Sequence, residues 1–293
     1  MEFRTLEFGL NAVASQGVTL NMYEKVSLDV ALVKLKKKAS VERELFFWGK
    51  LCCQETDYYI SYVVEDEQPS YPTKKFYYST GEFDFRDLPI LTDEQKKQLD
   101  AVGNIFLIGV PNRVIELGNE EGAVPADAAN SKEDDESDSD DRSSHHRVAL
   151  NEVHALSHRV SRIDDSTAVV PRGAFRLKFG NKIAPAPEFK GLSFGEAQKI
   201  SSWVHFRPAE NLENLKALAS TDYQFHADFL ETLESDVPKG SWSVRYDPSS
   251  STVTVRSLLW PGYIAYCVLN TNFFGGVYIG NGEQNLDLPF LLP

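Results

Sequence analysis

Hydrophobic and polar residues alternate one by one in the last part of the chain. Trp242, Val244 and Tyr246 are each separated by a polar residue, and the same pattern resumes after a Pro/Ser-rich break. A period of two predicts strands with one buried face, and the break predicts a hairpin loop. No helix long enough for a parallel crossover separates these runs, which predicts an antiparallel meander. Its strands would lie within Val237–Tyr246, Thr252–Gly262, Tyr263–Leu269 and Gly276–Gly280.

A second region of the same kind lies nearer the amino end. Leu45–Cys53 and Tyr58–Val64 are dense in aromatic and β-branched residues, and Lys74–Thr80 continues the pattern between prolines and a glycine. These three runs predict a second antiparallel meander. The apolar run Ile105–Val110, which Pro111 ends, predicts one further buried strand.

Apolar residues at three- and four-residue spacings predict helices around these strands. The longest would be capped by Thr19 and reach about Lys38, with a lysine-rich last turn that favours the negative end of the helix dipole. Its buried face would consist of Tyr23, Val26, Val30 and Val33. Shorter helices are predicted at Phe3–Ala14, from Thr92 through Leu99, around 156–163, from Ser193 to about Val204, and around 225–233.

The order of these elements indicates the fold class. Helices and strands come in separate runs and not in regular βαβ alternation, so the class is α+β, with antiparallel β-meanders and N-terminal and central helices. Residues 119–142 contain ten acidic and two basic residues and almost no large apolar residue. Such a composition predicts a disordered acidic loop over 119–147. The loop would divide the chain into an N-terminal part, 1–118, and a C-terminal part, 148–293.

Composition limits the classes of partner and compartment. A formal net charge of −13 argues against nucleic acid or an anionic membrane as the main partner. Three cysteines in 293 residues are too few for a disulfide framework, which favours a reducing interior. We expect no signal peptide and no membrane span, and therefore a soluble protein of the cytoplasm. Acidophilic kinases favour serines among acidic residues, which predicts phosphorylation of Ser131, Ser137 and Ser139.

Two short patterns suggest catalysis or metal binding. Gly191–Gly195 fits the G-x-S-x-G pattern of a hydrolase, with Ser193 as nucleophile, but a poor buried strand precedes it. Ser193 with Glu196 also forms a capping box, which explains the serine without catalysis. His154 and His158 are spaced like zinc ligands on a helix, yet no further ligand pattern accompanies them. We therefore expect no metal and no cofactor, and keep a serine hydrolase as the alternative function.

Several longer motifs resemble a known family. Phe47-Trp-Gly-Lys-Leu, Ser201-Ser-Trp-Val-His-Phe-Arg, Asp236-Val-Pro-Lys-Gly-Ser-Trp-Ser-Val and Arg256-Ser-Leu-Leu-Trp-Pro-Gly look like the signature of the radial spoke head proteins. The length of the chain makes it most similar to the radial spoke head protein 9 family. The resemblance covers nearly the whole chain except 119–147, and the motifs follow in the right order.

The resemblance implies a function that the residues alone do not. It implies a non-catalytic structural subunit of the radial spoke head, in the cytoskeleton of motile cilia or flagella, within the axoneme. Such a subunit would support spoke head assembly and the regulation of beating between the central pair and the dynein arms. The implied partners are the 4/6-type head proteins, spoke stalk protein 3 and head protein 1.

Apolar and aromatic residues near the carboxyl end are candidates for contact with such partners. Trp260 precedes a Pro-Gly turn at a strand end, and tryptophan is favoured as an interface anchor. The tail 285–293 is rich in large apolar residues, of which Leu288, Phe290 and Leu291 could contact a partner. Its prolines predict an extended segment lying in a groove, either of this chain or shared with a neighbouring subunit.

Overall fold

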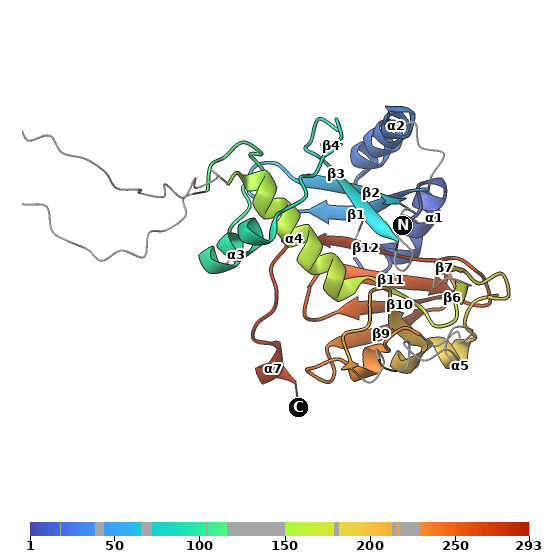
Figure 1. The fold of residues 1–293 in the computed structure, drawn as a ribbon. Helices are drawn as coiled ribbons and strands as arrows, with labels where there is room; N and C mark the ends of the chain where they lie inside the picture. The colour runs from blue at the N-terminus through green and yellow to red at the C-terminus, as the bar shows by residue number, and fades with distance from the viewer. Residues whose placement is uncertain are drawn as a thin grey trace, which may run out of the picture.

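The computed structural model describes most of the chain (Figure 1). The acidic segment 119–147, with Ser131, Ser137 and Ser139, lies outside the described residues, and so do residues 225–228 of the predicted helix around 225–233. The described remainder of that predicted helix, 229–233, is not α-helical, because Thr232 forms a β-bridge with Val204 and Leu233 begins a short 3-10 turn, so the prediction is wrong there. The described residues are 1–17, 19–38, 44–65, 72–103, 105–115, 150–178, 182–212, 216 and 229–292.

Eight strands form one sheet, in the order β4-β3-β2-β1-β12-β11-β10-β9. Strands β1 to β4 pair antiparallel with their neighbours in the chain, and so do β9 to β12, which confirms both predicted meanders. The α+β class is confirmed as well. The strands are β1 Leu45–Leu51, β2 Tyr58–Glu65, β3 Thr73–Ser79, β4 Arg86–Asp87, β9 Trp242–Asp247, β10 Thr252–Ser257, β11 Tyr263–Val268 and β12 Phe274–Gly280.

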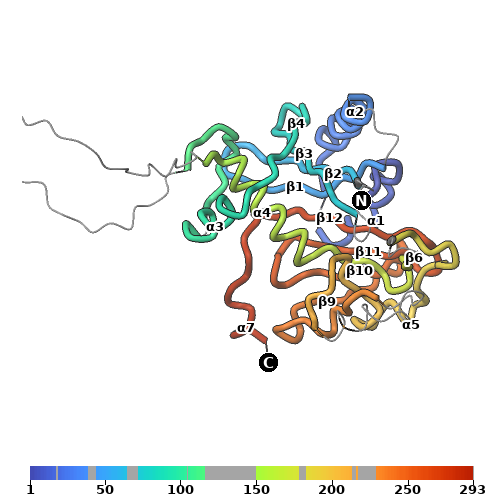
Figure 2. Tube along the Cα trace, viewed as in Figure 1, coloured from blue at the N-terminus to red at the C-terminus, as the bar shows by residue number. Residues whose placement is uncertain are grey.

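A parallel pair joins the two meanders at the middle of the sheet, where β1 lies beside β12 (Figure 2). Gly49, opposite Tyr278, has a φ of 156°, and a Cβ atom there would clash with the carbonyl oxygen of Tyr278. Glycine therefore permits the close approach. The amino group of Met1 lies at the same seam and donates hydrogen bonds to the carbonyl oxygens of Phe47, at 3.0 Å, and Gly276, at 3.1 Å.

This seam bears on the division of the chain. The sheet takes four strands from residues 1–118 and four from residues 148–293, so both parts contribute to one continuous layer. The division into these two parts with an acidic loop between them stays a prediction. Local patterning did not predict the β1–β12 pair, because both meanders are antiparallel within themselves.

Helices cover both faces of the sheet (Figure 1). One face packs against α1, Leu6–Ala14, which follows a short 3-10 turn at Phe3–Thr5, and against α2, Met22–Lys38. The other face packs against α4, Glu152–Thr167, which crosses the sheet diagonally. The α4 core residues Leu156, Val160 and Ile163 are fully buried, as the sequence predicted.

The buried face of α2 is not the predicted one. Leu28, Leu32 and Leu35 face the sheet, whereas the predicted apolar face of Tyr23, Val26, Val30 and Val33 is exposed. The helix has two apolar stripes, and the leucines fill the space over the aromatic strands. The predicted cap is wrong too: the Asn21 side chain accepts from the Glu24 N–H at 2.8 Å, and the Glu24 carboxylate accepts from the Asn21 N–H at 2.7 Å.

The predicted strand at Ile105–Val110 is wrong. The segment forms no strand: the Ile105 N–H donates to the Gly103 carbonyl, and the last three N–H groups of the segment donate to a side chain and not to a neighbouring strand. Oε1 of the fully buried Glu152 accepts from the N–H groups of Ile108, Gly109 and Val110, at 3.1, 2.6 and 3.1 Å. A carboxylate thus replaces the strand ladder.

Shorter elements complete the fold. The predicted helix from Ser193 to about Val204 is wrong beyond its first turn, because α5 ends at Ala197 and Trp203–His205 forms strand β8. None of the described helices combines the length and the hydropathy that a membrane-spanning helix needs. The remaining elements are α3 Asp93–Val102, β5 Val169–Pro171, β6 Phe175–Lys178, β7 Lys182–Pro185, η2 Ile200–Ser202, η4 Leu233–Ser235 and α7 Leu288–Leu291.

Candidate functional site: a polar cleft and the carboxyl-terminal tail

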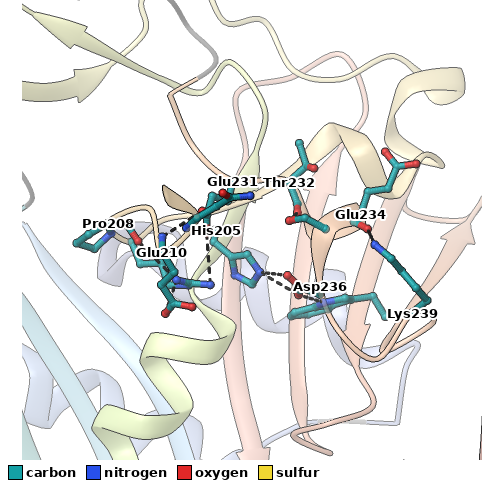
Figure 3. A network of polar contacts seen from close by, with 12 residues as sticks. His205, Pro208, Glu210, Glu231, Thr232, Glu234, Asp236 and Lys239 are labelled. Carbon is teal, nitrogen blue, oxygen red and sulfur yellow. Dashed lines mark hydrogen bonds and ion pairs between the residues drawn. The ribbon is translucent and has the colours of Figure 1, made fainter. Parts of the chain in front are cut away.

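A buried polar network joins stretches that are far apart in the sequence (Figure 3). Strand β8 carries His205, whose Nε2 atom lies 2.9 Å from both carboxylate oxygens of Asp236. Trp242, at the start of β9, donates its indole N–H to Asp236 Oδ2 at 2.7 Å. Asp236 therefore ties β8 and β9 together from the loop between them.

The charge on Asp236 is stabilised in the fold. Burial alone would raise the pKa of Asp236, but the hydrogen bond and charge of His205 and the indole N–H of Trp242 outweigh it, and the pKa is lowered. A lowered carboxyl pKa adds stability at a pH above that of an unfolded aspartate, about 3.9. This contribution is lost as the pH falls through the folded pKa.

A cluster of one arginine and two glutamates lies beside the His205–Asp236 pair. Arg207 contacts Glu210 Oε1 through Nη1 at 2.5 Å and Glu231 Oε2 through Nη2 at 3.6 Å. The other oxygen of Glu231 accepts from the backbone N–H groups of Glu210 and Asn211, at 3.0 and 2.6 Å. The Arg207 guanidinium and the carboxylates of Glu210 and Glu231 thus hold residues 207–211 against Glu231 (Figure 3).

These side chains line a cleft of about 460 Å³, together with Asp165 and Ser166 at the end of α4. Two serines of the lining are bonded elsewhere: Ser235 Oγ donates to the carbonyl of Thr232 at 2.7 Å, and Ser257 Oγ accepts from the Trp260 N–H at 3.1 Å. Within the described part of the chain, no hydrogen bond joins His205 to a serine. The polar side chains of the cleft therefore stabilise the loops around β8 and β9.

Ser193 lies at the start of α5 and not in this cleft. Its hydroxyl donates to Glu196 Oε2 at 2.6 Å, and its backbone N–H donates to the same oxygen at 3.0 Å. These bonds lower the pKa of Glu196, first through the Ser193 hydroxyl and then through its N–H. The capping box that the sequence predicted is present, and it accounts for the serine.

Replacing Ser193 with alanine should cost about 1 kcal/mol of stability, because the side chain caps a helix. Thermal unfolding of the purified variant measures this loss. Thr92→Ala, at the cap of α3, is the matched control and should give a loss of similar size, since Thr92 makes the same kind of capping box. Covalent labelling of Ser193 by a fluorophosphonate would contradict the capping role and restore the hydrolase alternative.

The two histidines of α4 are both engaged. His154 Nδ1 accepts from the Asn151 N–H at 3.2 Å, which completes the capping box of the helix. His158 Nε2 lies 3.2 Å from Asp100 of α3, and burial lowers the pKa of His158. In the part of the chain that the structure describes, no group of three or more His, Cys, Asp or Glu side chains forms a metal site.

The predicted contact residues of the carboxyl end fall into two groups. Trp260 and Leu288 are buried, 2% and 3% exposed, so the expectation that they face a partner is corrected: both fill the core. Phe290 and Leu291 point away from the body and are 88% and 70% exposed. The tail is also not fully extended, because Pro289 lies in the first turn of α7, where its missing N–H costs nothing.

Comparison with known proteins identifies the family. No family model matches the chain. The chain is 33% identical to the radial spoke head protein 9 homolog of Bos taurus, and 32% identical to those of Mus musculus and Homo sapiens. Each alignment spans 293 residues and covers 100% of both chains. The chain belongs to the radial spoke head protein 9 family.

Three of the four motifs that carry the likeness to the radial spoke head protein 9 family line the cleft, whereas Phe47–Leu51 lies in β1 of the large sheet. Ser201–Arg207 supplies His205, and Asp236–Val244 supplies the carboxylate that His205 contacts. Sequence reasoning missed the roles of Asp236, Arg207, Glu231 and Glu152, because a charge pair across the chain leaves no local pattern. The available signal was position: Arg207 closes one family motif and Asp236 opens the next.

Proposed function

We propose that this chain is a non-catalytic structural subunit of the radial spoke head in the axoneme of motile cilia or flagella. It supports assembly of the head and the regulation of beating between the central pair and the dynein arms. The proposal rests on one observation above all: relatives named radial spoke head protein 9 homolog align with the chain over their full length. An alignment that covers the whole of both chains supports a shared role.

The polar cleft agrees with a structural role. Its charged side chains contact one another over 2.5 to 3.6 Å and hold loops in place. The partners of the subunit would be other spoke head proteins, namely the 4/6-type head proteins and head protein 1, together with spoke stalk protein 3. Location in the cytoskeleton of the cilium follows from this assembly.

A tagged copy tests the proposal directly. The tagged chain replaces the native one in ciliated cells, axonemes are isolated, and proteins that co-purify after salt extraction are identified by mass spectrometry. We expect the chain in the axonemal fraction together with other radial spoke proteins. Recovery from the soluble cytoplasm alone, with no spoke protein attached, would contradict the proposal.

We further propose that the outer side of α7 contacts a neighbouring head subunit through Phe290 and Leu291. Both large apolar side chains are exposed, whereas Leu288 anchors the helix to the body and Leu292 lies against Gly240. The segment is also tied down at Asn285, whose N–H donates to the Leu259 carbonyl at 2.8 Å. The tail is thus held on this chain by one side and free on the other.

Two variants separate these sides. Phe290→Ser/Leu291→Ser should melt like the parent, because surface changes alter stability by only about 0.5 kcal/mol, yet should co-purify poorly with spoke proteins. Leu288→Ala should lower stability by about 2 kcal/mol or more, because it leaves a cavity. Normal assembly of the double variant would contradict the contact. A normal melting temperature for Leu288→Ala would show that the tail is not anchored here.

A further inference from the structure

Helix α2 is fixed to the sheet by its inner side. Leu28, Leu32 and Leu35 are buried against the strands. At its first turn, the carboxylate of Glu24 accepts from Lys50 Nζ at 2.6 Å and from the Tyr59 hydroxyl at 2.7 Å. Hydrophobic packing and a buried charge pair therefore set which side of the helix faces outward.

The outer side of α2 is apolar. Five large residues are exposed there, and they recur at three- and four-residue spacings, which places them on one stripe. A solvated helix face normally carries polar residues, and valine is not favoured there by helix propensity. A continuous apolar stripe in water marks an interaction surface. We call these residues the α2 stripe: Met22, Tyr23, Val26, Val30 and Val33, with 76%, 71%, 58%, 50% and 39% exposure.

Positive charge gathers at one end of the α2 stripe. Lys34, Lys37 and Lys38 are exposed in the last two turns. The chain as a whole has a net charge of −13, so this local excess of lysine runs against its composition. Cations are favoured at the carbonyl end of a helix, and among the described residues these three lysines form no ion pair, so their charge can meet an acidic partner.

We propose that the α2 stripe binds an amphipathic helix of a different protein, whose own apolar stripe packs on it and whose first turns are acidic. The bound helix runs antiparallel to α2. That direction places acidic residues, which are favoured at a helix N-terminus, against the lysines at the C-terminus of α2. The dipoles of the two helices then also oppose each other favourably.

A second copy of the chain fits the α2 stripe less well. In an antiparallel pair, the lysines of one copy would meet the first turn of the other, where the acidic residue is Glu24. That carboxylate is buried and already bonded to Lys50 and Tyr59. A parallel pair would place lysines against lysines. Charge complementarity therefore selects a partner with acidic residues of its own.

Photocrosslinking in assembled axonemes tests the proposal. The choice of axonemes rests on the proposed function, which places the partner of the α2 stripe there. p-Benzoylphenylalanine replaces Asp29, an exposed residue at the edge of the α2 stripe, and crosslinked peptides are sequenced by mass spectrometry. Lys97, exposed on α3 at the far end of the molecule, is the control position (Figure 2). We expect a peptide from another protein with a helical apolar repeat and acidic residues in its first turns. Crosslinks to a second copy, to a basic peptide or to nothing would overturn the proposal.

Two variants provide a second measurement. Val26→Ser/Val30→Ser should melt within about 2 °C of the parent but enter the axoneme at least about tenfold less. Lys34→Glu/Lys37→Glu should lower entry in the same direction, because it opposes acidic residues. Unchanged entry of the lysine variant would refute the acidic partner, and a large loss of stability in the valine variant would refute the exposed stripe. If the parent chain is absent from axonemes, the proposed function fails, and the same crosslinking on the complex that the chain does join decides the α2 proposal.

Discussion

Replacing Glu152 with alanine should destabilise the chain by about 3–5 kcal/mol, because several donors around this buried carboxylate would lose their acceptor, at a cost of about 1–3 kcal/mol each. Glu152 is fully buried, and Arg113 Nε lies 2.7 Å from its Oε2. Its other oxygen accepts from the Tyr58 hydroxyl at 2.9 Å and from three backbone N–H groups of segment 108–110. All of these donors would lose the carboxylate, and the Arg113 guanidinium would keep its hydrogen bond to the Phe106 carbonyl at 2.6 Å.

Urea unfolding of the purified protein measures the effect. Glu188→Ala is the matched control, because Glu188 pairs with Arg176 at 2.8 Å on the surface and should contribute at most about 1 kcal/mol. Glu152→Gln keeps the shape of the side chain and should lose less than the alanine variant. A loss below about 1 kcal/mol for Glu152→Ala would show that segment 105–113 is held by other contacts.

The protein should be less stable at pH 6 than at pH 8 by about 2 kcal/mol, because of the buried amino group of Met1. Burial, aided by the charge of Lys74, lowers the pKa of this amine from 8.0 to about 5. A depressed pKa in the fold means that the unfolded chain binds more protons between these two values, so stability is full above pH 8 and falls toward pH 5. At 1.36 kcal/mol per pKa unit, the whole difference amounts to about 4 kcal/mol.

Acetylation of the amino group provides the control. An acetylated chain has no titratable group at this position, so the difference between pH 6 and pH 8 should shrink to the small contribution of histidines such as His158. Urea unfolding of both forms at the two pH values measures it. An equal pH dependence in the two forms would mean that the amine of Met1 is hydrated and not inserted at the β1–β12 seam.

The local elements of this fold follow from the sequence. Alternation located the strands around Trp242 and Val253, and a capping pattern located α3 after Thr92, because short-range order depends on neighbouring residues. The pairing of β1 with β12 depends on contacts between residues more than 200 positions apart, such as Gly49 and Tyr278. No local pattern encodes such a pair.

Three predictions were wrong for physical reasons: the buried face of α2, the strand that ends at Val110, and the exposure of Trp260. The α2 helix has two apolar stripes, and sequence periodicity does not tell which of them, that of Leu28 or that of Val30, packs on the sheet. In the segment ending at Val110, a distant carboxylate competes with strand pairing for the backbone N–H groups. Trp260 precedes a turn, yet its ring fills the core. Tertiary contacts decide all three cases.

The candidate site was less predictable than the fold. Ser193 was correctly interpreted as a helix cap, since Glu196 follows at the right spacing. His205 and Asp236 are 31 positions apart and meet because the segment before Asp236 lies along β8, where Thr232 forms a β-bridge with Val204. Both residues lie in motifs of the family, but the motifs do not indicate that the two side chains form a pair.

Electron cryo-tomography of axonemes tests the central claim, that this chain is a subunit of the radial spoke head. Axonemes from ciliated cells that lack the chain are compared with axonemes in which a tagged copy has been restored. We expect spoke heads that lack density without the chain, and full heads with an added tag density after its return. Complete spoke heads in the absence of the chain, or a tag density outside the head, would contradict the account.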